Sequence, residues 1–121
     1  MQRFLQSFRF AFSGIWRMLR TQRNARIEMV IGAAACAMGW WLRISSDQWA
    51  ILALTIALVL IVEGFNSAIE AVVDLASPQI HPLAKAAKDL AAGMALIAAI
   101  ASFIVGLLIF GPAIWEKFLR N

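Results

Sequence analysis

Charged residues are scarce in this chain of 121 residues, because Asp, Glu, Lys and Arg together make up 15% of it. Soluble domains average about 25%. Hydrophobic residues make up 62%, and a soluble domain of this length could not bury so much apolar surface. Lipid must cover the remainder. The composition therefore excludes an ordinary soluble fold and indicates a single membrane domain over residues 1–121.

Cysteine and proline are also rare. Cys36 is the one cysteine, so no disulfide can form within the chain, and its place in an apolar run predicts a small buried residue. Among the three prolines, Pro78 and Pro82 predict a short polar loop, and Pro112 predicts the far end of the last span. No cleavable signal peptide is expected, because arginines interrupt residues 1–26 before an apolar run begins.

Three apolar runs predict three membrane-spanning helices, at 27–44, 48–74 and 89–115, with a loop at 75–88. Residues 27–44 would reach ~27 Å at ~1.5 Å per residue, which is enough for a span if the charges at its ends extend to the interface. The expected fold class is therefore an all-α integral membrane protein.

Residues 1–22 predict an amphipathic helix that lies in the membrane interface. Apolar side chains share one stripe at helical spacing and basic ones lie opposite: Phe4, Phe8, Ala11, Ile15 and Leu19 against Arg3, Arg9, Arg17 and Arg20. Phe10 is the exception, because it falls on the polar face between Arg3 and Arg17. An aromatic ring that dips sideways into the headgroups would explain its place.

Basic residues gather on one side of the predicted spans. They precede the first span or lie in the 75–88 loop at Arg3, Arg9, Arg17, Arg20, Arg23, Arg26, Lys85 and Lys88, whereas the other side has Arg43, Lys117 and Arg120. The positive-inside rule then places the N-terminus and the loop in the cytoplasm. Beside membrane spans these residues suit anionic lipid headgroups or a phosphate ligand, so we expect no nucleic-acid partner.

Polar residues form a stripe near the end of the second span. Glu63, Asn66, Glu70 and Asp74 step by three, four and four, which keeps them within an arc of about 80° on a helix. Ionisable residues within a span are costly and usually functional. A stripe that simply emerges into water is the alternative, and it suits Asp74 better than Glu63.

Depth along the helix separates the roles open to these residues. Glu63 lies ~10 Å deeper than Glu70, at headgroup depth, where a carboxylate could accept a proton from a lipid hydroxyl. Glu70, nearer the water, could hold a divalent cation on a soluble phosphate donor. Lys88 adds a positive charge at the same boundary, and His81 could contact a ligand or simply be solvated. Together these residues suit phosphoryl transfer.

Three segments carry a resemblance to a known family. Residues 63–74 read EGFNSAIEAVVD, residues 81–89 read HPLAKAAKD, and residues 23–27 read RNARI. They resemble the motifs of the prokaryotic diacylglycerol kinase family, which includes the undecaprenol kinases, and the resemblance covers almost the whole chain. It implies a kinase of the bacterial inner membrane that faces the cytoplasm. Such an enzyme transfers the γ-phosphate of ATP, with Mg²⁺, to the hydroxyl of a lipid alcohol.

The resemblance also implies roles by position. Glu63 matches the family's catalytic base, and Asn66 and Lys88 match residues near the transferred phosphate. Glu70 matches a ligand of the metal that ATP brings. The positions that match nucleotide contacts are Arg3, Phe10, Glu70, His81, Lys88 and Asp89.

The family is trimeric, so the resemblance implies a homotrimer with active sites between subunits. Small residues on the first and third spans would permit close helix contacts: Gly32, Ala33, Ala34, Ala35, Gly39, Ala91, Ala92, Gly93 and Gly106. One departure concerns the metal. Gln22 occupies a position where many members have a glutamate that helps to hold the ion, and an amide oxygen can coordinate Mg²⁺ but brings no charge.

Alternatives stay open at two levels. Within the family the lipid is diacylglycerol or undecaprenol, and the segments 23–27 and 81–85 look more like the undecaprenol-kinase branch. From another class, a small proton-coupled exporter also carries a membrane glutamate, but such chains generally have four spans with the glutamate in the first. A structural or regulatory membrane protein gives no reason for an acidic stripe that meets Lys88 and Asp89.

Overall fold

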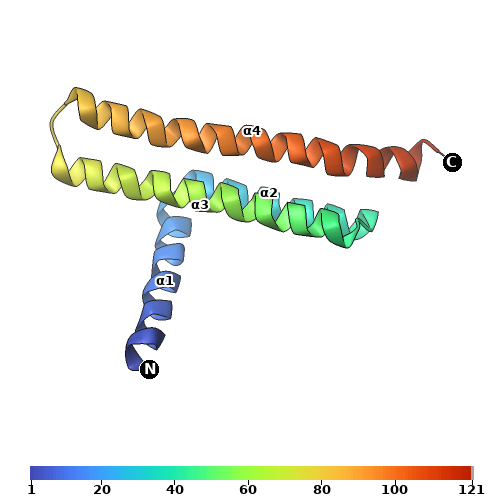
Figure 1. The fold of residues 1–121 in the computed structure, drawn as a ribbon, viewed down its shortest axis with the longest axis horizontal. Coiled ribbons are helices and arrows are strands. Elements are labelled where there is room, and N and C mark those ends of the chain that lie inside the picture. The colour runs from blue at the N-terminus through green and yellow to red at the C-terminus, as the bar shows by residue number, and fades with distance from the viewer. Residues whose placement is uncertain (121) are drawn as a thin grey trace.

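The computed structural model describes residues 1–120, which form four helices joined by short connections (Figure 1). They are α1 (Gln2–Thr21), α2 (Arg23–Leu42), α3 (Ser46–Ala76) and α4 (Pro82–Phe118). Residues 1–120 contain no strand. By length and composition, α2, α3 and α4 can each cross a membrane. The all-α class with three candidate spans is therefore confirmed.

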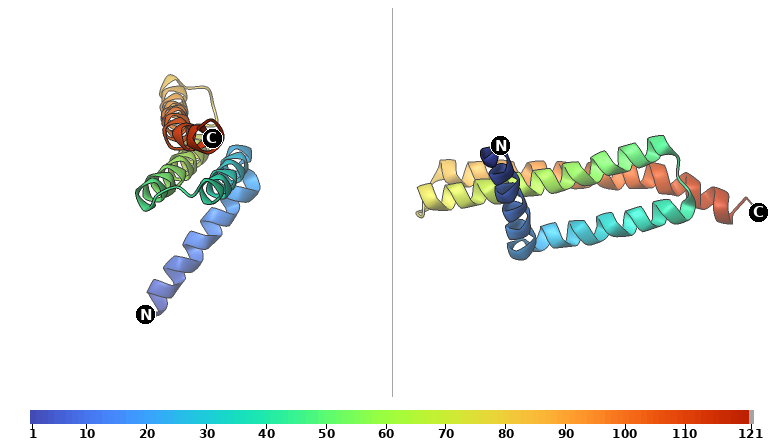
Figure 2. Two further views of the ribbon diagram at one scale, coloured as in Figure 1. Left: turned by 90° about the vertical axis from the view of Figure 1, so that its right-hand side faces the viewer. Right: turned by 90° about the horizontal axis from the view of Figure 1, so that it is seen from below.

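The three long helices lie side by side, and α1 turns away from them (Figures 1 and 2). α3 and α4 form an antiparallel hairpin with the most extensive packing in the described chain, and α2 lies along α3. The C-terminal end of α1 meets this bundle, and the first turns of α1 extend away from the long helices (Figure 2).

Gln22 alone separates α1 from α2. Its extended backbone (φ −108°, ψ 112°) breaks the helix, while its N–H still donates to the Met18 carbonyl at 2.8 Å. The Arg26 guanidinium closes the corner, because its Nη1 donates to the carbonyls of Leu19 at 3.2 Å and Arg20 at 2.8 Å. The last carbonyls of a helix need partners outside the helix, so Arg26 helps to fix the direction in which α1 leaves the bundle.

The turn from α2 to α3 is tight. Arg43 adopts a left-handed backbone (φ 55°, ψ 53°) that ends α2, and Ser45 begins α3 with a capping box. Glycine is required at position 39 because any larger residue would come too close to its neighbours. A Cβ added to it would lie 2.9 Å from Ile44 Cδ1 and 3.1 Å from the Trp49 ring.

The connection between α3 and α4 is shorter than the sequence indicates. It comprises residues 77–81, whereas the predicted loop covers 75–88. The His81 Nδ1 caps α4 by accepting a 3.1 Å hydrogen bond from the Leu83 N–H, and the fixed φ of Pro82 suits the first helical turn. The chain is therefore helical from Pro82 onward, and the last part of the predicted loop belongs to α4.

Pro112 does not end a helix, because α4 continues to Phe118, and the far end of the last span stays a prediction. A proline removes one helix hydrogen bond, whereas unwinding in lipid would leave several backbone groups without partners. Cys36 is exposed rather than buried, because α2 packs along a narrow strip through the buried Gly32 and Gly39, and Cys36 lies beside that strip.

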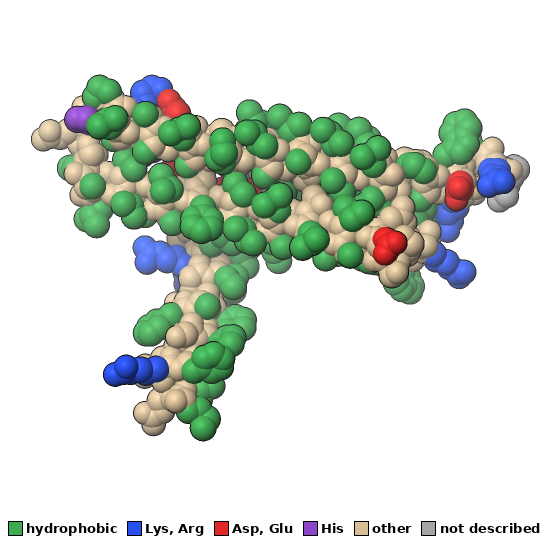
Figure 3. All heavy atoms as spheres, in the orientation of Figure 1, with side chains coloured by type: hydrophobic (Ala, Val, Ile, Leu, Met, Phe, Trp, Pro, Cys, Tyr) green, Lys and Arg blue, Asp and Glu red, His purple; other side chains and the backbone are tan. Residues whose placement is uncertain are grey.

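The core is small, and most large apolar side chains face outward (Figure 3). Ile44, Leu52 and Ile109 form a buried cluster. Outward-facing side chains such as Phe103 and Leu108, which are 67% and 69% exposed, would be unfavourable in water. In a membrane the same surface meets hydrocarbon, as three spanning helices require.

Candidate active site

The acidic stripe lies on α3, and its members differ sharply in exposure. Glu63 is the one buried charged residue among residues 1–120, with 3% of its surface exposed. Asn66 is half-buried, whereas Glu70 and Asp74 are exposed. The helical spacing therefore carries the stripe from the interior of the bundle to its surface.

Two polar residues from the start of α2 lie near Glu63. The side chain of Asn24 lies beside the Glu63 carboxyl group. Glu28 is close enough to Glu63 for the two carboxyl groups to interact electrostatically. Asn24, Glu28, Glu63 and Asn66 are called the buried polar cluster below, after its buried member Glu63. Asn24 is exposed, and Glu28 and Asn66 are half-buried.

The buried polar cluster has unused hydrogen-bonding capacity. Glu28 Oε2 and Asn66 Oδ1 are buried and have no hydrogen-bond partner within residues 1–120. Leaving a buried acceptor without a donor costs roughly 1–3 kcal/mol, and native proteins rarely do so without a reason. A ligand hydroxyl that entered the cluster would supply the missing donor.

Asn24 and Glu28 are not among the predicted site residues. A signal for each is present in the sequence, because Glu28 is an ionisable residue inside an apolar helix and Asn24 belongs to the RNARI segment. Their closeness to Glu63, however, depends on how α2 packs against α3. Local sequence does not specify that packing.

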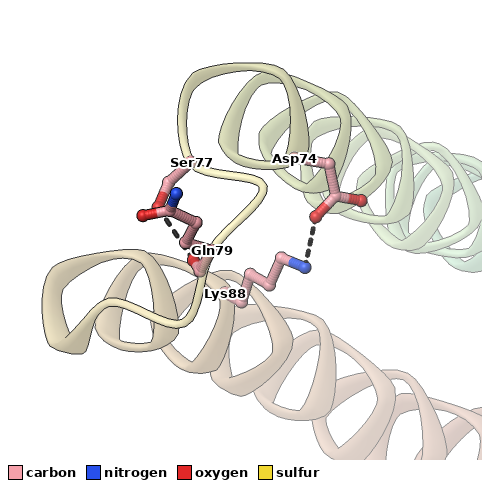
Figure 4. Close-up of polar contacts among 4 residues, drawn as sticks. All are labelled: Asp74, Ser77, Gln79 and Lys88. Carbon is pink, nitrogen blue, oxygen red and sulfur yellow. Dashed lines mark hydrogen bonds and ion pairs between the residues drawn. The ribbon is translucent and has the colours of Figure 1, made fainter.

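The exposed end of the stripe meets the first turns of α4 (Figure 4). Lys88 Nζ donates to Asp74 Oδ1 at 2.5 Å and lies near enough to Glu70 to interact with its charge. The hydrogen bond to Asp74 raises the pKa of Lys88, so its ammonium group stays charged. In the turn between the helices, Ser77 Oγ donates to the Gln79 carbonyl at 3.0 Å. Lys88 thus brings a positive charge to the water-side end of the stripe.

The other residues that the resemblance implies as nucleotide contacts lie in two places. His81 caps α4, and Asp89 accepts a hydrogen bond of 2.5 Å from Lys85 Nζ, so both are within two turns of Lys88. Arg3 lies in the first turn of α1, which extends away from α3 and α4 (Figure 1). Within a single chain the stripe therefore lies beside Lys88, whereas Arg3 lies away from both.

A cleft of about 960 Å³ opens between α1 and α3. Most of its wall is apolar: Phe10, Ala11, Gly14, Ile15, Met18, Leu19, Met29, Ala57, Leu60, Ile61, Gly64, Ala68 and Ala71, joined by Arg17, Thr21, Gln22 and Ser67. Gly64 and Ser67 are the sequence neighbours of Glu63 and Asn66. The cleft therefore follows α3 beside the acidic stripe, and its wall suits a hydrocarbon chain.

A comparison with protein families decides what kind of protein carries this arrangement. A family model described as prokaryotic diacylglycerol kinase matches residues 9–110, which is most of the chain. This chain belongs to the prokaryotic diacylglycerol kinase family. The matched residues include the whole acidic stripe, Lys88 and the cleft between α1 and α3.

Individual relatives give the same result. The chain is 43% identical over 112 residues to the undecaprenol kinase of Bacillus subtilis, covering 93% of this chain and 91% of that protein. It is 48% identical over 103 residues to a diacylglycerol kinase of Synechocystis sp., covering 84% and 59%. It is 30% identical over 116 residues to the diacylglycerol kinase of Escherichia coli, covering 96% and 92%. Lipid kinases thus match nearly the full length of the chain.

Membership of the diacylglycerol kinase family makes this chain a membrane lipid kinase, a phosphotransferase that uses ATP and a lipid substrate. The three candidate spans agree with that setting. The alternative of a proton-coupled exporter is not supported, because the matched relatives are kinases.

Membership of the family implies ATP, whereas the Mg²⁺ that the resemblance implies stays a prediction. Residues 1–120 contain no group of three or more His, Cys, Asp or Glu side chains placed to hold a metal. Mg²⁺ is commonly held by one or two carboxylates plus substrate phosphates and waters, so the predicted site does not require such a group. Glu70, exposed and near the charge of Lys88, is a carboxylate of that kind.

Proposed function

We propose that this lipid kinase transfers the γ-phosphate of ATP to the hydroxyl of a lipid alcohol, with Glu63 as the general base. The buried polar cluster is the observation that carries the proposal. Glu63 is 3% exposed there, beside two acceptor atoms without donors. A lipid hydroxyl would enter the cluster as a donor, and the neighbouring cleft would take the attached hydrocarbon chain.

The residues of the stripe divide the work of phosphoryl transfer. Glu63 takes the hydroxyl proton while the lipid oxygen forms its bond to the γ-phosphorus, and the bond from that phosphorus to the bridging oxygen breaks to release ADP. Lys88 balances the negative charge of the transferred phosphoryl group. The Asn66 amide donates a hydrogen bond to the same group. When bound, Mg²⁺ neutralises negative charge on the ATP phosphates, and Glu70 would hold it.

Two lipid alcohols are candidate substrates. Undecaprenol is the first, because the undecaprenol kinase of Bacillus subtilis matches 93% of this chain and 91% of its own length. Diacylglycerol is the second, because the relative from Synechocystis sp. is a diacylglycerol kinase at 48% identity. The cleft suits the hydrocarbon chains of both, so the end that bears the hydroxyl must distinguish them.

The proposed setting is the bacterial inner membrane, with the active site facing the cytoplasm. Basic residues gather on the side of Lys88, as the positive-inside rule requires. α1 would lie in the interface as an amphipathic helix, because Phe4, Phe8 and Phe12 are exposed on one side of it and its arginines lie opposite.

A homotrimer would complete the nucleotide site. Arg3, on α1, lies apart from Lys88 within one chain, so the proposed ATP contacts by Arg3, Phe10, His81 and Asp89 need parts of more than one subunit. Close helix contacts have room on α4. A Cβ added to Gly93 or Gly106 meets nothing within 4 Å in the described chain, which leaves those faces open to a neighbour.

A lipid-kinase assay tests the proposed function. Purified full-length protein in mixed micelles receives ATP labelled in its γ-phosphate and either undecaprenol or diacylglycerol. We expect labelled undecaprenyl phosphate, labelled phosphatidic acid or both, and we expect chelation of Mg²⁺ to stop the reaction. Failure to label either lipid in the presence of Mg²⁺ would contradict the proposal.

A further inference from the structure

A second pocket lies at the other end of the bundle, where α2 ends, α3 begins and α4 ends. Its volume is about 440 Å³, within the range of roughly 300–1,000 Å³ that small-ligand sites occupy. The polar and aromatic part of its wall is formed by Trp41, Arg43, Gln48, Glu116 and Lys117. It is called the far-end pocket below.

Lys117 is held in place within the far-end pocket. Its Nζ lies 4.5 Å from the centroid of the Trp41 ring and donates to the Trp41 carbonyl at 3.4 Å. The same ring packs against Phe118, with 5.6 Å between ring centroids. An ammonium group has three protons to donate. Lys117 is therefore positioned with donors left for a ligand.

Opposite charges line the far-end pocket without pairing. Within residues 1–120 the ion pairs shorter than 4.0 Å are Lys85–Asp89 and Lys88–Asp74, so Arg43, Glu116 and Lys117 form none. Gln48 accepts a hydrogen bond from the Ser45 N–H through its Oε1, which leaves its amide N–H groups as donors. Two cations, a carboxylate and an amide thus share one space.

Tryptophans mark the depth of the far-end pocket in the membrane. Four lie at this end of the long helices: Trp40, Trp41, Trp49 and Trp115. Tryptophan is enriched at the membrane–water boundary, where lipid headgroups lie. A pocket at this depth, open and charged, faces the headgroup layer rather than the hydrocarbon.

We propose that the far-end pocket binds the headgroup of a zwitterionic phospholipid with a primary ammonium group, the phosphoethanolamine class. Arg43 and Lys117 would donate to the phosphodiester, and the lipid ammonium would donate to Glu116. A phosphatidylglycerol headgroup offers Glu116 neutral hydroxyl donors but no positive charge, and a choline headgroup has no N–H to donate. The pocket is remote from Glu63 and Lys88, so this proposal does not depend on the lipid-kinase mechanism.

Native mass spectrometry on purified full-length protein in detergent tests this proposal. The protein is titrated separately with phosphatidylethanolamine, phosphatidylcholine and phosphatidylglycerol that carry the same acyl chains. We expect phosphatidylethanolamine to bind at least about tenfold more tightly than phosphatidylcholine, as a charge-assisted hydrogen bond allows. Glu116→Gln should remove that preference, and Arg43→Gln should weaken the binding of all three lipids.

Arg120→Gln is the matched control, because it removes a basic residue at the same end of the chain from outside the pocket wall. It should bind lipids as the wild type does. Lys117→Gln is a second pocket variant in case Arg43→Gln does not fold, and kinase activity reports folding for all of them. Equal wild-type affinity for phosphatidylethanolamine and phosphatidylcholine, or a preference for phosphatidylglycerol, would overturn the proposal. So would pocket variants whose titrations match that of Arg120→Gln.

Discussion

Glu63 brings an ionisable group into the part of α3 that the other helices cover. Removing a carboxylate from water without a full set of partners costs several kcal/mol, and an aliphatic side chain would pack there at no such cost. Asn24 and Glu28 lie near it, so the polar residues gather rather than disperse. A ligand that uses the cluster would offset this cost, which is why we assign the chemistry to Glu63.

The Glu63→Gln substitution keeps the size of the side chain and removes the base. We expect kcat to fall at least ~100-fold, the lower range for general-base catalysis, while the KM for ATP changes little. Initial rates at varied ATP concentration measure both. Asp47→Asn removes a carboxylate from the other end of α3 and should keep the wild-type rate. Wild-type kcat in Glu63→Gln would show that the carboxylate is structural.

Lys88 and Asp74 form an ion pair, but we expect them to differ in importance. The two side chains are 42% and 66% exposed, and exposed ion pairs contribute little to stability. Asp74→Asn should therefore leave both Tm and kcat close to the wild type. Lys88→Gln should lower kcat/KM for ATP at least about tenfold, because it removes a charged donor to phosphate.

Lys85→Gln is the control for Lys88→Gln, since it removes the same charge one turn earlier in α4. It should keep most of the activity. Equal losses in the two variants would contradict a specific role for Lys88 and would instead indicate a general effect of positive charge at this end of α4.

Helices, as elements, were largely predictable, whereas their ends and contacts were not. Apolar runs mark the three spans, and spacing marks the stripe from Glu63 to Asp74. The pair His81 and Pro82 is typical of a loop and equally of the start of a helix. The sequence alone therefore does not specify where α4 begins. Contacts between helices have no local signal. For that reason the sequence does not predict that Asn24 and Glu28 lie near Glu63.

Gly39 allows α2, the following turn and α3 to pack closely, and we predict its contribution to stability. A Cβ there would approach Ile44 Cδ1 to 2.9 Å and the Trp49 ring to 3.1 Å. Gly39→Ala should destabilise the fold by about 1–3 kcal/mol, the usual cost of overpacking. Gly111→Ala is the control, since its Cβ meets nothing within 4 Å in the described chain. Denaturant unfolding in mixed micelles compares them, and equal stabilities would contradict the packing argument.

The junction between α1 and α2 allows a test of the metal site. Gln22 stands there, half-exposed and in the wall of the cleft, at a position where the resemblance implies a glutamate in many members. If the amide replaces a carboxylate ligand, Gln22→Glu adds charge at the ion. Apparent Mg²⁺ affinity should then increase by on the order of 1–3 kcal/mol, with the lipid KM nearly unchanged. Gln6→Glu makes the same change on α1, away from the junction, and Mg²⁺ titrations that overlay for both variants would exclude the ligand role.

The whole molecule is longer than a bilayer is thick. α4 has 37 residues, so it extends ~55 Å against a hydrocarbon core of ~30 Å. Its charged residues near the start, Lys85, Lys88 and Asp89, precede the uncharged stretch from Leu90 to Trp115. The first turns of α4 therefore extend into the headgroup layer and water. A soluble nucleotide can reach Lys88 there while a lipid stays within the membrane.

Orientation is the property of the whole molecule on which access to cytoplasmic ATP depends. We predict that the connection between α3 and α4 faces the cytoplasm and that the turn between α2 and α3 faces outward, because basic residues gather beside the former. Single cysteines at the exposed positions Gln79→Cys and Ser46→Cys, each in a Cys36→Ser background, report the two sides. An impermeant thiol reagent applied to intact spheroplasts should label Ser46→Cys at once and Gln79→Cys only after lysis. The reverse order of labelling would contradict this topology, because it would place Glu70 and Lys88 on the side of the membrane that lacks ATP.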